Sequence, residues 1–385
     1  MTPAARVQTA IELLDQILAG DPAERVLTGW ARRSRFAGSK DRAAIRDHVF
    51  DVLRRRNSCA ARGAGRTDGR GLMTGLLWQD GVDPRTLFTG GPYGPEPLTG
   101  AEQTEGPDDG VLDLPEWLIP QMQASLGDEF AETERALRQR APVMLRMNTR
   151  KSDMAQAIRV LAADGIVAET HPIADTALKV TTGMRRVANG EAYKSGLVEL
   201  QDGSSQAAAA AISLTTGARV LDYCAGGGGK SLALAARVTG QFWAHDSEPA
   251  RMGDLPARAA RAGVEVTPVT SEEINEKDTF DAVICDVPCS GSGAWRRSPD
   301  AKWRFTADRL AALNEVQSEI LHAAAPRVAP GGRLIYMTCS VLDAENRVIP
   351  DRFLAQNAGW RVTQVRHWPV SDGGDGFFMA QLDRE

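Results

Sequence analysis

The stretch Val220-Leu221-Asp222-Tyr223-Cys224-Ala225-Gly226-Gly227-Gly228-Gly229-Lys230 decides the fold, because a short apolar run passes into four glycines and then into a helical segment. Glycine lets the backbone approach a ligand closely where a strand turns into a helix. The same rhythm of strand, loop and helix continues toward the C-terminus. We predict strands at 219–221, 241–244, 281–284 and 333–336, and helices at 230–238, 249–261 and 307–328. Such alternation indicates an α/β fold with a parallel, doubly wound sheet.

Three kinds of nucleotide site use a glycine loop between a strand and a helix, and the residues of this loop distinguish among them. A phosphate-binding Walker loop needs glycine where Cys224 stands, and the dinucleotide fingerprint needs glycine where Ser231 stands. The remaining spacing, Asp222-x-Cys224-x-Gly226-x-Gly228, resembles the acidic, glycine-spaced loop of proteins that bind S-adenosylmethionine. We therefore predict that the loop binds S-adenosylmethionine.

Asp246 supports the same cofactor, because it ends the next predicted strand. A carboxylate at that position typically hydrogen-bonds ribose hydroxyls. The alternative is a helix N-cap ahead of Pro249, since aspartate favours caps. We favour the ribose role.

Two cysteines also close apolar runs: Cys289 in Asp286-Val287-Pro288-Cys289 and Cys339 in Thr338-Cys339-Ser340. The ends of parallel strands share one crevice, where ligands bind. A thiolate there is a candidate nucleophile. The alternative is that a free cysteine is simply a small buried hydrophobe, which is our interpretation of Cys59 and Cys285. Cys289 and Cys339 therefore indicate covalent chemistry beside a cofactor.

A thiolate and a methyl donor together suggest a specific reaction. Addition of a thiolate to carbon 6 of a pyrimidine makes carbon 5 nucleophilic enough to attack the donor methyl. A base must then remove the proton at carbon 5 and expel the thiol. Asp286 could hydrogen-bond the amino group and protonated ring nitrogen of cytosine, although a structural cap at the strand end is its alternative role.

The N-terminal part differs in composition. Residues 4–58 have apolar side chains at helical spacing, and residues 1–70 hold fourteen Lys/Arg against eight Asp/Glu. Residues 71–140 hold four basic and thirteen acidic residues. This asymmetry is compatible with a basic arm for a polyanion, the alternative being ordinary solvated helix faces. We predict an all-α domain over 1–90, a Gly/Pro-rich linker over 91–112, a small α+β extension over 113–190 and the main domain over 191–385.

The overall composition excludes several classes of protein. The chain has 385 residues and lacks any run of about 18 apolar residues, so we expect no transmembrane helix. Its five cysteines have neither the spacing of a zinc site nor the density of a disulfide scaffold. We expect a cytoplasmic monomer that holds no metal.

Several further motifs follow one another in order along 195–347: Gln201-Asp202-Gly203-Ser204-Ser205-Gln206, Val220 to Ala225, Asp286 to Gly293, Pro299 to Arg304, Gln317, Pro330 to Ser340 and Glu345-Asn346. With these motifs the chain resembles the Sun family of RNA cytosine-5 methyltransferases. Asp375-Gly376-Phe377-Phe378 near the C-terminus also agrees. The N-terminal helices resemble the NusB-like RNA-binding domain attached to the bacterial 16S ribosomal RNA member of the family.

The resemblance implies a Rossmann-like, S-adenosylmethionine-dependent methyltransferase core, a covalent Cys–cytosine intermediate and a ribosomal RNA substrate. It makes Cys339 the nucleophile and Cys289 the thiol that assists release, with Asp286 and Lys230 beside them. DNA cytosine methyltransferases use the Pro-Cys position as nucleophile, which leaves the opposite assignment open. The implied cofactor contacts are Asp222, Cys224, Ala225, Gly226, Gly227, Gly228, Lys230, Asp246, Arg251, Asp286 and Pro288.

Two departures from the family pattern stand out. The usual Cys-Ala-Ala-Pro-Gly-Gly-Lys has become a run in which Gly226-Gly227 replaces Ala-Pro, so we expect a more flexible loop. The acidic residue expected near the third strand is absent, and Thr270 or Ser271 takes its place. These departures support a second hypothesis, an RNA-binding or ribosome-assembly factor that has lost activity on the same fold.

Overall fold

The computed structural model describes residues 1–385, which form two compact units. We call the first the helical unit; it comprises 1–120, 130–140 and 295–305. The second, the sheet unit, comprises 121–129, 141–294 and 306–385. These units follow a different division from the four domains that we predicted. No helix of the chain combines the length and the apolar character needed to cross a membrane.

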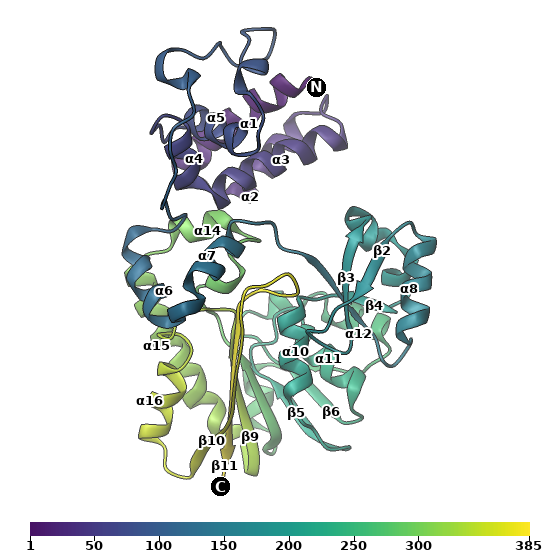
Figure 1. The fold of residues 1–385 in the computed structure, drawn as a ribbon. Helices are drawn as coiled ribbons and strands as arrows, with labels where there is room; N and C mark the ends of the chain where they lie inside the picture. Colours follow the sequence, from purple (N-terminus) through teal and green to yellow (C-terminus); the bar gives the residue numbers. More distant parts are fainter. The chain divides into compact units, whose positions relative to one another are not determined.

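The helical unit is built from amphipathic helices, as their spacing predicted (Figure 1). In α1 the buried positions include Ala10, Leu13, Leu14 and Ile17, which share one face at helical spacing. They pack with apolar side chains of the other helices in one core. The helices are α1 (Pro3–Leu18), α2 (Ala23–Arg33), α3 (Ser39–Arg54), α4 (Arg56–Arg62), α5 (Gly69–Gln79), α7 (Phe130–Leu137) and α14 (Pro299–Arg304).

The segment that we predicted as a linker, 91–112, packs within the helical unit. Leu98 enters the helical core. Glu102 lies in the short 3-10 helix Gly100–Gln103 and is buried against Arg66 and Arg70, at 2.9 and 2.8 Å. The hydrogen bond from Arg70 lowers the pKa of Glu102 to about 2. Gly and Pro in this segment therefore shape an ordered chain.

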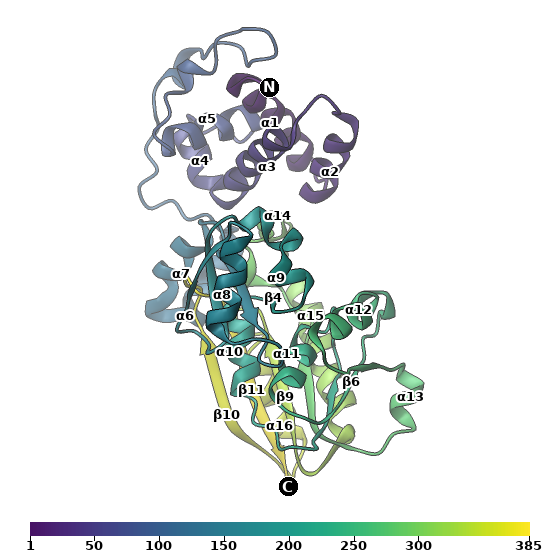
Figure 2. The same cartoon turned by 90° about the vertical axis from the view of Figure 1, so that its right-hand side faces the viewer.

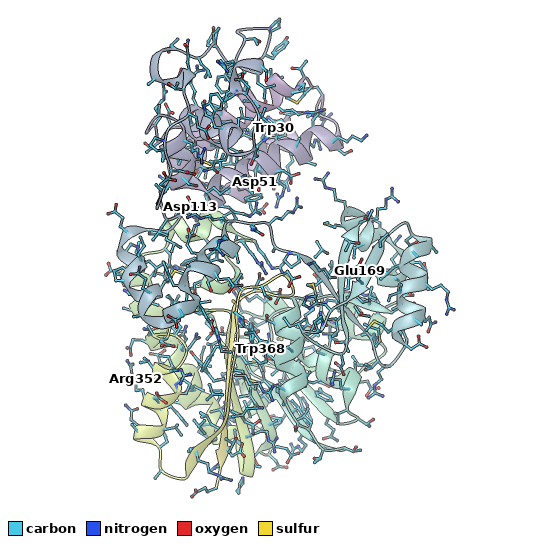
Figure 3. The ribbon with its side chains drawn as sticks, in the orientation of Figure 1. Trp30, Asp51, Asp113, Glu169, Arg352 and Trp368 are labelled. Atoms are coloured by element: carbon cyan, nitrogen blue, oxygen red, sulfur yellow. The ribbon has the colours of Figure 1, made fainter.

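The helical unit also includes α14, which comes from the middle of the sequence of the sheet unit. Lys302 is fully buried there, and its Nζ donates hydrogen bonds to the carbonyl oxygens of Arg54 and Asp113, at 3.2 and 2.5 Å. The indole of Trp303 donates to the Leu53 carbonyl at 2.7 Å. Burial lowers the pKa of Lys302 to about 8. Figure 3 labels Asp113, one of the two acceptor residues.

The sheet unit contains a seven-stranded sheet in the order β10-β11-β9-β8-β5-β6-β7. The five strands from β9 to β7 in this order run parallel, whereas β11 pairs antiparallel with β9 and with β10. The strands are β5 (Arg219–Asp222), β6 (Gln241–Ala244), β7 (Thr267–Pro268), β8 (Phe280–Asp286), β9 (Val328–Thr338), β10 (Trp360–Trp368) and β11 (Phe377–Arg384).

Helices cover both faces of this sheet, which confirms the doubly wound architecture (Figure 2). Successive residues of a strand point to opposite faces. Ala282 and Ile284 of β8 pack in one core, whereas Val283 and Cys285 pack in the other. Both faces of the central strands are apolar for this reason. The helices are α10 (Gly203–Ala211), α11 (Gly229–Arg237) and α12 (Leu255–Ala262) against one core, and α13 (Ser271–Asn275), α15 (Ala307–Ala324) and α16 (Val348–Gln356) against the other.

The predicted helix over 249–261 forms as two pieces, a 3-10 turn Pro249–Met252 and then α12. Gly253 and Asp254 separate them, and Pro256 occupies the first turn of α12, where its missing N–H costs no hydrogen bond. The predicted helix over 307–328 ends at Ala324 and continues as the 3-10 turn Ala325–Arg327 around Pro326.

A smaller antiparallel sheet in the order β2-β3-β1-β4 precedes the main sheet along the chain. Its elements are β1 (Val143–Met147), α8 (Met154–Ala163), β2 (Val167–Thr170), β3 (Ala177–Thr182), α9 (Glu191–Lys194) and β4 (Val198–Leu200). Strands and a helix are therefore present within 113–190, where we predicted a small α+β extension. The fourth strand lies beyond the boundary that we predicted at 190.

Candidate active site

The glycine loop adopts backbone conformations that its glycines permit. Gly226 has φ +50° and Gly228 has φ +76°, and Gly228 caps the N-terminus of α11. A Cβ added to Gly228 would lie 2.3 Å from Cδ1 of Leu255. Gly228 is therefore required both by its backbone conformation and by the close packing of α12.

Side chains from four surrounding segments hold this loop. The Asp246 carboxylate accepts a hydrogen bond from the Gly226 amide at 3.0 Å. Arg258 donates to the Gly227 carbonyl. Arg146 and Gln201 both donate to the Gly229 carbonyl, at 3.0 and 3.2 Å. Although Gly226-Gly227 replaces the family's Ala-Pro pair, contacts from outside the loop therefore fix its path.

A cavity of about 870 Å³ opens between the glycine loop and the two cysteines. This volume lies in the range of small-molecule sites. Of the residues that we predicted in the site, ten line the cavity: Cys224, Ala225, Gly226, Gly227, Asp246, Arg251, Asp286, Pro288, Cys289 and Cys339. The sheet thus brings together at one edge residues that are spread over more than a hundred positions of sequence.

Three predicted residues, Asp222, Gly228 and Lys230, do not line the cavity. Asp222 is buried beneath the loop and accepts a hydrogen bond from the Ser231 hydroxyl at 2.7 Å. Burial raises the pKa of Asp222 to about 6. Direct contact of Asp222 with a ligand in this cavity is not supported by this arrangement, because the side chain points into the protein.

Lys230 is buried as well, and its Nζ lies 2.5 Å from the carboxylate of Asp286, which does line the cavity. Burial disfavours the charged ammonium, but the Asp286 carboxylate outweighs it and raises the pKa of Lys230. The ammonium also lies over the Phe377 ring, 4.8 Å from its centroid. Lys230 therefore reaches the cavity only through Asp286.

The two cysteines that close β8 and β9 face each other across the cavity wall. Their sulfur atoms are 3.4 Å apart, which is contact distance for two thiols. The hydrogen bond with Cys339, together with burial, raises the pKa of Cys289 well above its usual range. Cys59 and Cys285 are fully buried, as we predicted, and burial raises the pKa of each thiol.

Sequence reasoning missed part of the cavity wall. His245 is almost fully buried; its ring nitrogens contact the Tyr223 carbonyl at 2.8 Å and the Ser271 hydroxyl at 2.9 Å. Of the two residues proposed for the position of the missing acid, Ser271 lines the cavity and Thr270 caps α13 instead. A lone histidine after a strand carried no signal that distinguished it from a core residue.

A face of α15 forms the opposite wall, with Val316, Glu319, Ile320 and Ala323. These positions follow helical spacing, which the sequence does show. Val316, which is 40% exposed, presents an apolar side chain to the cavity. The sequence alone does not show that this face of α15 and the glycine loop line the same cavity; the three-dimensional structure does.

Comparisons with known proteins agree with this geometry. The model for 16S rRNA methyltransferase RsmB/F matches residues 209–383, and that for the RsmF/B-like ferredoxin-like domain matches residues 114–186. The chain is 33% identical over 293 residues to ribosomal RNA small subunit methyltransferase B of Xanthomonas campestris, covering 70% of this chain and 66% of that protein. It is 30% identical over 296 residues to the protein of the same name from Vibrio cholerae, covering 74% and 68%.

The fold has a close counterpart among solved structures. The crystal structure of PH0851 superposes with a TM-score of 0.76 at 23% identity, covering 100% of this chain and 99% of that one. At this identity the likeness concerns the fold alone. The matched region spans about two thirds of the length of the bacterial relatives, 66% in the Xanthomonas protein.

Proposed function

Because the chain belongs to the RsmB/F family of rRNA methyltransferases, we propose that it transfers a methyl group from S-adenosylmethionine to carbon 5 of a cytosine in ribosomal RNA. The observation that carries the proposal is the pair of thiols, 3.4 Å apart, in the same cavity as the glycine loop. Cytosine-5 chemistry needs one sulfur that bonds carbon 6, and a second thiol beside it can assist the release of that bond.

The cavity is suited to the cofactor. The loop residues Ala225 to Gly227 expose backbone to it, and Asp246 follows β6 at the position that receives ribose hydroxyls. Ile320 and Val316 provide an apolar wall suitable for an adenine ring. S-adenosylmethionine, when bound, supplies an electrophilic methyl group.

The thiol at Cys339 supplies the nucleophile in this proposal. Its sulfur bonds carbon 6 of cytosine as the ring nitrogen takes up a proton, and carbon 5 becomes nucleophilic toward the methyl group. Asp286 lines the cavity and is charge-paired with Lys230, so it can hold the amino group and the protonated ring nitrogen. Thus Asp286 and Lys230 stabilise the activated base.

Release needs the proton at carbon 5 to leave, after which the double bond to carbon 6 reforms and the Cys339 thiolate departs. Cys289 has the nearest sulfur to Cys339, and this position suits it to assist that step. The target base must be unstacked, because a thiol cannot reach carbon 6 within a helix.

The surface of the helical unit supports an RNA partner. Arg32, Arg33, Arg35 and Lys40, around the turn between α2 and α3, are exposed, and none of them is paired with a carboxylate. Phe36 stands among them with 75% of its surface exposed. Exposed cations suit phosphates, and an exposed aromatic ring suits an unstacked base. Figure 3 labels Trp30, which is half-buried on the adjoining α2.

The proposal is tested by incubating small-subunit RNA with the purified protein and S-adenosylmethionine, followed by bisulfite sequencing. We expect one cytosine to become resistant with the wild-type protein and none with Cys339→Ala. An active Cys339→Ala protein would reverse the assignment of the thiols. Calorimetric titration with S-adenosylmethionine addresses the alternative, since a failure to bind would favour an inactive RNA-binding factor.

A further inference from the structure

A buried carboxylate lies behind the two cysteines and outside the cavity. Glu345 has no exposed surface, and no lysine, arginine or histidine is paired with it. A buried carboxylate is costly unless hydrogen bonds satisfy its oxygens. Its partners are neutral donors: the Ser290 amide at 2.7 Å, the Gln317 side-chain amide at 3.1 Å, the Ser340 hydroxyl at 2.5 Å and the Ser290 hydroxyl.

These donors belong to both cysteine turns. Ser290 follows Cys289, and Ser340 follows Cys339. One carboxylate therefore bridges two turns that come from different strands. Gln317 of α15 reinforces the first turn, because its Nε2 also donates to the Pro288 carbonyl at 3.0 Å. Cys289 is thus fixed on both sides.

Asn346, the residue after Glu345, holds the turn that contains Cys339 in a similar way. The Asn346 side-chain oxygen accepts a hydrogen bond from the Thr338 hydroxyl at 2.5 Å, and its Nδ2 donates to the Ser340 carbonyl at 3.0 Å. Thr338 and Ser340 flank Cys339. Cys339 is therefore also fixed on both sides, by a residue adjacent to Glu345 in the chain.

We propose that Glu345 and Asn346 are positioning residues that set the distance between the Cys289 and Cys339 sulfurs and thereby balance formation of the RNA adduct against its release. The second half of this statement rests on the proposed function; the first half does not. Small displacements of reacting groups have large effects on rate. A loosened bridge lets Cys339 still bond carbon 6 while Cys289 is no longer held where it assists departure.

The role of Glu345 and Asn346 in setting the distance between the two sulfurs is tested by oxidation with diamide, without RNA or cofactor. Two thiols lose two electrons and two protons to diamide and form one disulfide, at a rate that depends on how often the sulfurs meet. We expect Glu345→Gln and Asn346→Ala to slow formation of the Cys289–Cys339 disulfide about tenfold. Glu315→Gln, at an exposed glutamate of α15 paired with Arg352, is the matched control and leaves the rate unchanged.

The balance between formation and release of the RNA adduct is tested by trapping the adduct during turnover. We expect Glu345→Gln to raise the fraction of protein in an SDS-stable RNA adduct severalfold while the turnover rate falls about tenfold and the KM for RNA stays within twofold. Simple loss of folding would lower the adduct, so an increase is specific to positioning. If Glu345→Gln fails to fold, Ser290→Ala and Ser340→Ala, which each remove one donor, take its place.

The outcomes separate the two proposals. Wild-type rates of disulfide formation and a wild-type adduct fraction in Glu345→Gln would overturn the positioning role. A slowed disulfide in a protein that never methylates RNA would leave the positioning of the sulfurs intact and reject the proposed function.

Discussion

The ammonium of Lys230 lies 2.5 Å from the carboxylate of Asp286, and only Asp286 borders the cavity. A residue that the family resemblance places in the site thus acts through its neighbour. Its removal would leave Asp286 and the buried Asp222 without their nearest cation. Breaking a buried pair from one side is strongly destabilising.

We therefore expect Lys230→Met to lower the methylation rate at least tenfold and to lower the melting temperature. Steady-state kinetics and thermal unfolding measure the two effects. Lys277→Met, at a half-buried lysine of the sheet unit that lies over the Trp243 ring and outside the cavity, is the control. Full activity in Lys230→Met would show that Asp286 needs no paired cation.

Cys289→Ala should separate bond formation from release. The variant keeps Cys339 but loses the sulfur 3.4 Å from it. We expect a slowly migrating protein–RNA adduct on denaturing gels, dependent on S-adenosylmethionine and absent in the Cys289→Ala/Cys339→Ala double variant. If the double variant still forms the adduct, Cys339 is not the residue that bonds the base.

Asp246→Asn should weaken cofactor binding more than stability. Asp246 accepts hydrogen bonds from the Gly226 and Glu248 amides and borders the cavity. We expect the dissociation constant for S-adenosylmethionine to rise about tenfold or more, since a charge-assisted hydrogen bond is worth roughly 1.5–3 kcal/mol. Isothermal titration calorimetry measures the change. Asp254→Asn, at an exposed position nearby, should bind as the wild type does.

Phe36→Ala should weaken RNA binding at the turn between α2 and α3. Loss of one stacked base costs about 1–3 kcal/mol, so we expect at least a fivefold weaker complex in filter binding. Arg35→Ala should instead reduce the dependence of affinity on salt concentration by somewhat less than one counterion. Arg85→Ala, at an arginine paired with Asp83 in the same unit, is the control. Unchanged binding in both test variants would place the RNA surface elsewhere.

Lys302 should make stability depend on alkaline pH. Its pKa is about 8 in the folded chain against 10.5 in the unfolded one, so the unfolded state binds more protons between these values. The free energy of unfolding therefore rises with pH across this window, by up to roughly 3 kcal/mol. Below the folded pKa both states are protonated and this contribution is lost. Denaturant unfolding of the full chain at several pH values measures it, and Lys302→Met should lack that rise; an equal rise in the variant would contradict the assignment.

Much of the main sheet could be predicted from the sequence, because its central strands are apolar on both faces and end in recognisable turns. The strands that contain Val220, Phe242, Val283 and Leu334 all form near their predicted positions. The antiparallel pair β10 and β11 was not predicted. β10 has a mostly exposed face with polar residues between its apolar ones, so its apolar signal is weak.

The candidate site was also predictable only in part from the sequence. Residues in turns after apolar strands, such as Cys289 and Asp246, could be predicted to share one edge. The direction of a side chain could not: Asp222 ends a strand like the others, yet it points beneath the loop. His245 and the wall of α15 come from tertiary packing between distant segments, which no local pattern encodes.

The position of α14 in the helical unit has a consequence for biosynthesis. Residues 1–120 leave the ribosome well before Lys302 and Trp303 are made. The side chains of these two residues donate hydrogen bonds to the carbonyl oxygens of Leu53, Arg54 and Asp113. The intervening stretch, from 120 to 295, takes roughly ten seconds or more to translate at about 5–20 residues per second. During that time the nascent helices lack part of their final structure, so a fragment ending at 120 would be an unfinished fold, and the helical unit is completed only after residue 305 has been synthesised.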